Sequence, residues 1–133
     1  MTAPLFRNID CFGVQVPDLD EGLAFYQGKL GHRLLWRSPT SAGLAFADGG
    51  QMPELLLHTD AWPIATALKV ESATEAIERF VACGGTIVEA PVEIPIGWLA
   101  VVSDPWTNHI VLLDSTKGQL QTDADHQVVG VGR

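Results

Sequence analysis

Basic residues are scarce in this chain of 133 residues. Eight lysines and arginines stand against sixteen aspartates and glutamates, which gives a net charge of −8 at pH 7. Nucleic-acid phosphates require a basic surface, so this deficit argues against nucleic acid as a partner. It favours neutral or cationic small molecules, although an acidic surface also serves simply to keep a protein soluble.

Cysteines, long apolar runs and common catalytic motifs are also lacking. Cys11 and Cys83 are the only cysteines, and their spacing fits neither a disulfide framework nor a paired-ligand metal motif. No apolar run approaches the ~20 residues of a membrane-spanning helix, and the opening MTAPLFRNID does not resemble a signal peptide. We find no Gly-rich phosphate loop, nucleophile elbow or His-Glu metal helix. These absences predict a cytoplasmic protein that does not associate with membranes.

The composition that remains, 47% hydrophobic and 18% charged, is typical of one folded domain. The run NIDCFGVQV at the start of the chain predicts a strand. In PDLDEGLAFYQGKLG, Asp18 is a helix N-cap with Glu21 three residues later, and Gly31 is a natural C-terminal residue. HRLLWRS, GLAFADG and ELLLHT are three further strand candidates, separated by glycine, proline and serine.

The second half repeats this βαβββ order. IATALKVES predicts a strand, Ser72 and Glu75 form a capping box, and the strands TIVEAPVEI, GWLAVVSD and NHIVLLD follow. An offset of 54 aligns the first strand and helix of each half, and an offset of 56 then aligns Asp48 with Asp104. We therefore predict an α+β fold with tandem βαβββ modules, about 5–60 and 61–114, in a single domain 1–114. Residues 115–133 form a C-terminal hairpin or extension.

Two βαβββ units and the turn DPWTN before a last apolar strand resemble the vicinal-oxygen-chelate superfamily. This group includes glyoxalases, extradiol dioxygenases, fosfomycin-modifying enzymes and bleomycin-resistance proteins. The resemblance covers about residues 5–114, and its most specific parts are VPDLDEGLAFYQGKLG and SDPWTNHIVLLD. In the latter, Thr107 replaces the family's usual glycine and Trp106 its usual small polar residue. The resemblance implies curled sheets around a cavity and a homodimer.

Metal-using members of this superfamily carry ligands at four inward-facing strand positions. In this sequence the four positions correspond to Cys11, Leu55, Ala65 and Val111. A hard divalent ion requires three or four oxygen or imidazole donors, and a single thiol cannot hold it. The resemblance therefore implies no metal and no cofactor. A one-residue slip in PELLLHTD would turn Glu54 or His58 inward, still without matching the family's pattern.

Other residues suggest how a ligand could be held. Trp36, Phe46 and Trp98 lie on predicted strands, and aromatic rings on a concave sheet bind flat apolar or cationic molecules. Ordinary core packing is the alternative for each ring. His109 shares a face with Val111, because strand side chains alternate with a period of two. Three interpretations of His109 are open: a ligand contact, a general base or an ordinary strand histidine. Cys11 is either a reactive thiol or a small buried hydrophobe.

Three functions are compatible with this pattern. The first is a metal-free small-molecule-binding protein similar to the bleomycin-resistance branch. The second is a metal-dependent lyase, isomerase or dioxygenase, and the third is a metal-independent enzyme using His109 or Cys11. The residues at the ligand positions favour the first over the second and do not separate the first from the third. The expected ligand is aromatic or cationic, and its predicted cavity residues are Cys11, Trp36, Phe46, Leu55, Ala65, Trp98, His109 and Val111.

Overall fold

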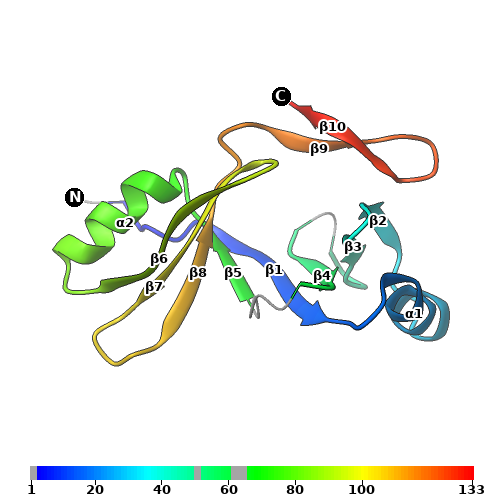
Figure 1. The fold of residues 1–133 in the computed structure, drawn as a ribbon, viewed down its shortest axis with the longest axis horizontal. Helices are drawn as coiled ribbons and strands as arrows, with labels where there is room; N and C mark the ends of the chain where they lie inside the picture. The colour runs from blue at the N-terminus through cyan, green and yellow to red at the C-terminus, as the bar shows by residue number, and fades with distance from the viewer. Residues whose placement is uncertain (1–2, 50–51, 61–65) are drawn as a thin grey trace. The chain divides into compact units, whose positions relative to one another are not determined.

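The computed structural model describes residues 3–49, 52–60 and 66–133. It is a mixed α+β structure dominated by strands (Figure 1), as the sequence predicts. Contacts divide the chain into two compact units, which are described separately. The N-terminal unit comprises Asp10–Ala65 and Gln121–Gly130, and the C-terminal unit comprises Met1–Ile9, Thr66–Leu120 and Val131–Arg133. Within the described ranges, no helix is long and apolar enough to cross a membrane.

The sheet of the N-terminal unit has the strand order β2-β3-β4-β1. Antiparallel pairing of β3 with β4 sets Leu44 opposite Leu55, and parallel pairing of β1 with β4 sets Cys11 beside Glu54. The parallel neighbours β1 and β4 are separated in the chain by the helix and by two strands. The strands are β1 (Asn8–Gln15), β2 (Leu34–Arg37), β3 (Ser41–Ala45) and β4 (Glu54–His58).

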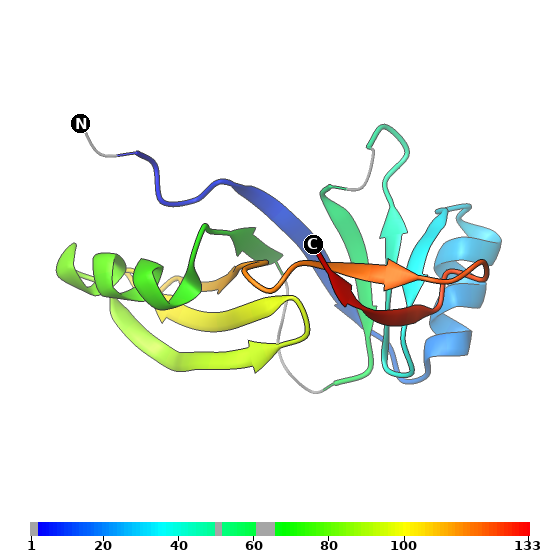
Figure 2. The ribbon, with the colours of Figure 1, turned by 90° about the horizontal axis from the view of Figure 1, so that it is seen from above.

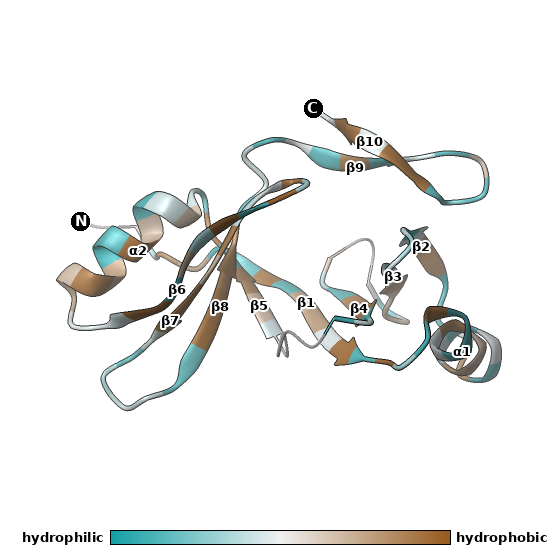
Figure 3. Ribbon diagram, viewed as in Figure 1, coloured by the Kyte–Doolittle hydropathy of each residue, from teal (hydrophilic) through white to brown (hydrophobic). Residues whose placement is uncertain are grey.

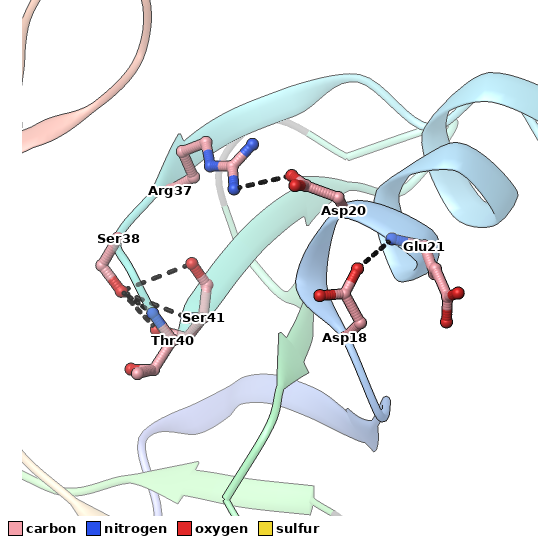
Figure 4. A network of polar contacts seen from close by, with 7 residues as sticks. All are labelled: Asp18, Asp20, Glu21, Arg37, Ser38, Thr40 and Ser41. Carbon is pink, nitrogen blue, oxygen red and sulfur yellow. Dashed lines mark hydrogen bonds and ion pairs between the residues drawn. The ribbon is translucent and has the colours of Figure 1, made fainter.

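Helix α1 (Leu19–Leu23) packs on one face of this sheet and continues as the π-helix η1 (Ala24–Lys29). The Asp18 carboxylate caps it by accepting the Glu21 amide at 2.9 Å, a bond that satisfies one of the free N–H groups at a helix start. Arg37 Nη2 on β2 donates to Asp20 Oδ1 on α1 at 3.1 Å, which links the helix to the sheet (Figure 4).

The core of the N-terminal unit lies between α1 and the sheet. Leu19 and Leu23 of the helix pack there against side chains of β3 and β4 and against Val16, the residue after β1. Those strand residues alternate along the chain, as expected for one face of a pleated sheet. The buried cluster consists of Val16, Leu19, Leu23, Ala42, Leu44, Leu55 and Leu57.

The C-terminal unit repeats this element order with the strand order β5-β8-β7-β6. Ser72 caps α2 (Ala73–Ala82) by accepting the Glu75 amide, as the capping box predicts. Figure 2 shows α2 lying along its sheet, and Figure 3 shows the hydrophobic stretch of β8. Val70, Ala73, Ala76, Val102 and Leu112 form the buried cluster beneath α2. The strands are β5 (Thr66–Lys69), β6 (Thr86–Ile94), β7 (Gly97–Ser103) and β8 (His109–Leu113).

One buried carboxylate joins three segments of the C-terminal unit. Asp114 is 1% exposed, and its Oδ2 accepts the amide of Ala73, the first residue of α2, at 2.6 Å. Its Oδ1 accepts the Trp98 amide at 3.0 Å and the amide and hydroxyl of Thr116 at 3.2 and 2.9 Å. Gly97 makes room for this carboxylate, since a Cβ there would lie 2.1 Å from Oδ1.

The C-terminal extension forms a two-stranded hairpin. Strands β9 (Gln119–Thr122) and β10 (Val128–Gly132) pair as a two-stranded sheet. In the turn, Asp123 Oδ1 accepts the amides of Asp125 and Gln127 at 2.8 and 3.0 Å. His126 takes a positive φ of 63° there.

Candidate functional site

The face of the N-terminal sheet that is turned away from α1 carries a thiol, an indole, a carboxylate and an imidazole. We call this face the far face. Leu55 and Leu57 pack in the core with α1, so the alternation along β4 turns Glu54, Leu56 and His58 the other way. Strand pairing adds residues of β1 and β3, and a bulge adds Trp36 of β2. The far face therefore contains Cys11, Gly13, Gln15, Trp36, Ser41, Gly43, Ala45, Glu54, Leu56 and His58.

A β-bulge brings Trp36 to this face. Leu34 pairs with Leu44 and packs on the helix-side core, and a regular strand would point Trp36 the same way. The irregularity between Leu34 and Trp36 shifts the register, so that Trp36 pairs with Gly43. Bulges commonly redirect a side chain in this manner. The indole then lies over Gly43, where a Cβ would sit only 2.2 Å from Nε1.

The indole N–H of Trp36 is directed at the Glu54 carboxylate. Nε1 lies 3.2 Å from Oε1 and 3.1 Å from Oε2 and donates to both oxygens. Shared donation of this kind orients the carboxylate without neutralising it. The far face thus combines a half-buried aromatic ring with an oriented acidic group.

His58 stands two strand positions beyond Glu54 on the same face. The residue is 4% exposed. Nδ1 lies 3.2 Å from the Asp60 carbonyl oxygen, and Nε2 is buried with no hydrogen-bond partner among the described residues. Cys11, beside Glu54 in the register, is 1% exposed and forms no disulfide.

The structure corrects the expected orientation of three predicted cavity residues. Leu55 is part of the helix-side core, and Phe46 packs against the same cluster with its ring edge-on to His32. Trp98 packs against the cluster beneath α2, with Lys117 Nζ 5.4 Å from the ring centroid. Core packing, the alternative for each ring, describes Phe46 and Trp98, and Trp36 alone of the three rings is on a far face. Ala65 lies outside the described residues.

The error at Leu55 has a simple origin in the register. Val111 pairs with Ala67 in the C-terminal unit, and Leu56 pairs with Gly13 in the N-terminal unit. The two halves are therefore offset by 54 residues at the first strand and by 55 at the last, rather than by 56. Leu56, not Leu55, is the counterpart of Val111.

The far face of the C-terminal unit is apolar where the N-terminal one is polar. Val111 is 7% exposed and pairs with Ala67 on one side and Val101 on the other, both buried. His109 is on the same face as Val111, as predicted, because Ile110 and Leu112 point to the α2 side. It is exposed at the start of β8, opposite Ser103.

Comparison with known proteins identifies the family. The model of the Glyoxalase/Bleomycin resistance protein/Dioxygenase superfamily matches residues 8–112. The chain belongs to this superfamily. No curated protein sequence matches it significantly.

Solved structures of similar fold are distant in sequence from this superfamily member. Methylmalonyl-CoA epimerase from Mycobacterium tuberculosis is 19% identical, with a TM-score of 0.65 over 87% of this chain and 93% of that one. A hypothetical protein from Bacillus halodurans C-125 is 20% identical, with a TM-score of 0.63 over 86% and 96%. An extradiol ring-cleaving dioxygenase from B. fuscum is 19% identical, with a TM-score of 0.56 over 86% of this chain and 34% of that one. At these identities the likeness shows the fold alone.

The metal that some superfamily members use does not fit the residues present here. With the register corrected, the described ligand positions are Cys11, Leu56 and Val111. Two aliphatic side chains and one thiol lack the oxygen and imidazole donors that a hard divalent ion needs. Across the described ranges, no group of three or more histidines, cysteines, aspartates or glutamates is arranged to hold a metal.

Proposed function

We propose that this superfamily member is a metal-free small-molecule-binding protein, similar to the bleomycin-resistance branch, and that it holds its ligand on the far face of the N-terminal unit. The observation that supports this proposal is the Trp36–Glu54 pair, in which an aromatic ring and an oriented carboxylate share one sheet face. The aliphatic side chains of Leu56 and Val111 at the family's ligand positions argue against the metal-dependent alternatives.

The expected ligand is aromatic and either cationic or neutral. The Trp36 ring offers stacking or cation–π contact, which contributes about 0.5–2 kcal/mol. The Glu54 carboxylate and the net charge of −8 favour a positive group. Micromolar affinity needs roughly −8 kcal/mol, so burial of the ligand's own apolar surface must supply most of it.

The proposal is tested by titrating the protein with matched cationic, neutral and anionic aromatic compounds in a calorimeter. We expect the cationic compounds to bind best. Glu54→Gln keeps an acceptor for the Trp36 indole and removes the charge, so it should reduce the preference for cations by about tenfold, equivalent to about 1.4 kcal/mol. Trp36→Leu should weaken every binder by removing the ring.

Trp106→Leu is the matched control. Trp106 is 77% exposed in the turn before β8 and is not part of the proposed face, so its replacement should leave affinity unchanged. Binding that is insensitive to both Trp36→Leu and Glu54→Gln in folded proteins would contradict the proposed site. Failure of every compound in the panel to bind would contradict the proposed function itself.

The metal-free part of the proposal has its own measurement. Elemental analysis of the purified protein should find no stoichiometric zinc, nickel, manganese or iron. A chelator should leave the melting temperature unchanged, because only a bound ion contributes stability by linkage. Near one equivalent of metal, lost together with stability on chelation, would support a metal-dependent enzyme instead.

We also propose a homodimer. The edge strand β6 exposes Ile87, Val88 and Val92, and apolar groups on a sheet edge favour association. Light scattering at micromolar concentration should give twice the 14.3 kDa of one chain. The mass of a single chain would contradict the dimer.

A further inference from the structure

The unpartnered nitrogen of His58 suggests which chemical group the ligand presents. A buried polar atom without a hydrogen bond destabilises the folded protein, so such atoms usually have a partner in the working state of a protein. Nε2 of His58 is such an atom among the described residues, and it lies on the face for which ligand binding is proposed above.

The contact of the other ring nitrogen determines what Nε2 can do. Nδ1 lies 3.2 Å from the Asp60 carbonyl oxygen, and a carbonyl oxygen can only accept a hydrogen bond. Nδ1 therefore carries the proton and donates it. In the neutral imidazole the second nitrogen is then an acceptor, so Nε2 offers a lone pair.

Neither residue paired with His58 in the sheet donates a hydrogen bond to Nε2. Ser41 is opposite His58 on β3, but its hydroxyl lies 2.9 Å from that of Ser38, in the loop between β2 and β3 (Figure 4). Gln15, beside His58 on β1, is exposed to solvent. The buried acceptor is thus left for a group from outside the sheet.

From this geometry we propose that His58 Nε2 is a specificity-determining acceptor, and that the ligand is an apolar molecule with a hydroxyl or amino group that donates to it. The inference rests on the proposed function. Glu54 provides a second acceptor on the same strand, with the apolar Leu56 between them. A face with acceptors at both ends and an indole nearby selects molecules that donate hydrogen bonds over those that only accept them.

The test compares 1-naphthol with 1-methoxynaphthalene, which has the same rings and lacks the O–H donor. In long-range 1H–15N spectra, the free protein should show His58 protonated at Nδ1 and unprotonated at Nε2. Addition of 1-naphthol should shift the Nε2 resonance upfield, and 1-methoxynaphthalene should not. The chain has four histidines, so His58→Gln assigns the signal by its loss.

Affinity provides the second readout. The wild-type protein should bind 1-naphthol about two- to twelvefold more tightly than 1-methoxynaphthalene, the range of one net hydrogen bond. His58→Phe keeps a ring and removes the acceptor, so the ratio should fall to near one. His58→Gln places an amide oxygen near the position of Nε2 and should keep part of the preference. His32→Phe, on the helix side next to Phe46, is the matched control and should leave the ratio unchanged.

Three results would overturn the inference. One is a His58 ring protonated at Nε2 in the free protein. Another is an Nε2 signal that neither compound moves, or that both move equally, as expected if a buried water is its partner. The third is a preference for 1-naphthol that persists in His58→Phe. None of these would affect the proposed function if the wider panel binds and Trp36→Leu weakens it.

Discussion

Replacing Asp114 by asparagine should destabilise the protein far more than the loss of one exposed charge. Both oxygens of Asp114 accept hydrogen bonds, Oδ2 from Ala73 and Oδ1 from Trp98 and Thr116. Asparagine has one oxygen and one NH2 group. Whichever way the asparagine amide is turned, its NH2 group takes the place of one carboxylate oxygen. At least one buried backbone N–H that donated to that oxygen then has no acceptor.

The magnitude follows from those contacts. A hydrogen bond to a charged group contributes about 1.5–3 kcal/mol, and an unsatisfied buried donor costs about 1–3 kcal/mol. Because the same N–H enters both figures, we expect Asp114→Asn to lower the free energy of unfolding by about 2–4 kcal/mol. The loss affects the start of α2 and the start of β7 together, since Asp114 connects them.

Urea unfolding followed by circular dichroism measures this change, with an unchanged slope as evidence that the folded state is otherwise intact. Asp123→Asn is the matched control. Asp123 accepts two amides through Oδ1 alone, at an exposed turn, so asparagine keeps both bonds. Its effect should stay within about 0.5 kcal/mol. The reasoning is refuted if Asp114→Asn is as stable as the wild type.

Three other predictions concern turns and the far face. Thr107→Gly should stabilise the protein by about 0.5–1 kcal/mol in thermal melts, because Thr107 has a φ of 67° that suits glycine; a lower melting temperature would contradict this. The side-chain amide of Asn108, then its backbone N–H, lowers the pKa of Asp104 below the ordinary 3.8. The stability from this turn should therefore be present above pH 3.8 and be lost as the pH falls through the lowered pKa, and Asp104→Asn should remove this pH dependence in acid unfolding. Gly43→Ala should displace the Trp36 indole, lower stability by about 1–3 kcal/mol and change tryptophan fluorescence; an unchanged spectrum would contradict the close packing.

Local signals in the sequence predicted the elements well. Asp18 and Ser72 cap their helices as expected, since a cap depends on residues only three positions apart. The π-helix was not predicted. Its Ala24–Lys29 stretch follows α1 directly and changes the helical period. Leu30, the residue after this stretch, is 53% exposed.

The functional residues were harder to predict than the elements. Glu54 and His58 were considered only as the result of a one-residue slip, and the structure has that register. No pattern within PELLLHTD distinguishes the two registers, because its three consecutive leucines suit either face. The contacts of Leu55 and Leu57 with α1 decide it.

The sequence by itself determined the fold class and the superfamily. It also showed that aliphatic residues replace metal ligands on the last strand of each half. These features depend on residue type, order and approximate spacing. Only the tertiary structure decided which side chains share a face. Strand side chains alternate with a period of two, so a shift of one residue reverses every side chain in a strand. Here such shifts arise from the bulge before Trp36 and from loops of unequal length in the two halves, and they are set by strand pairing between segments far apart in the chain. Those pairings turned Trp98 and Phe46 into core residues and put Trp36, Glu54 and His58 on one face.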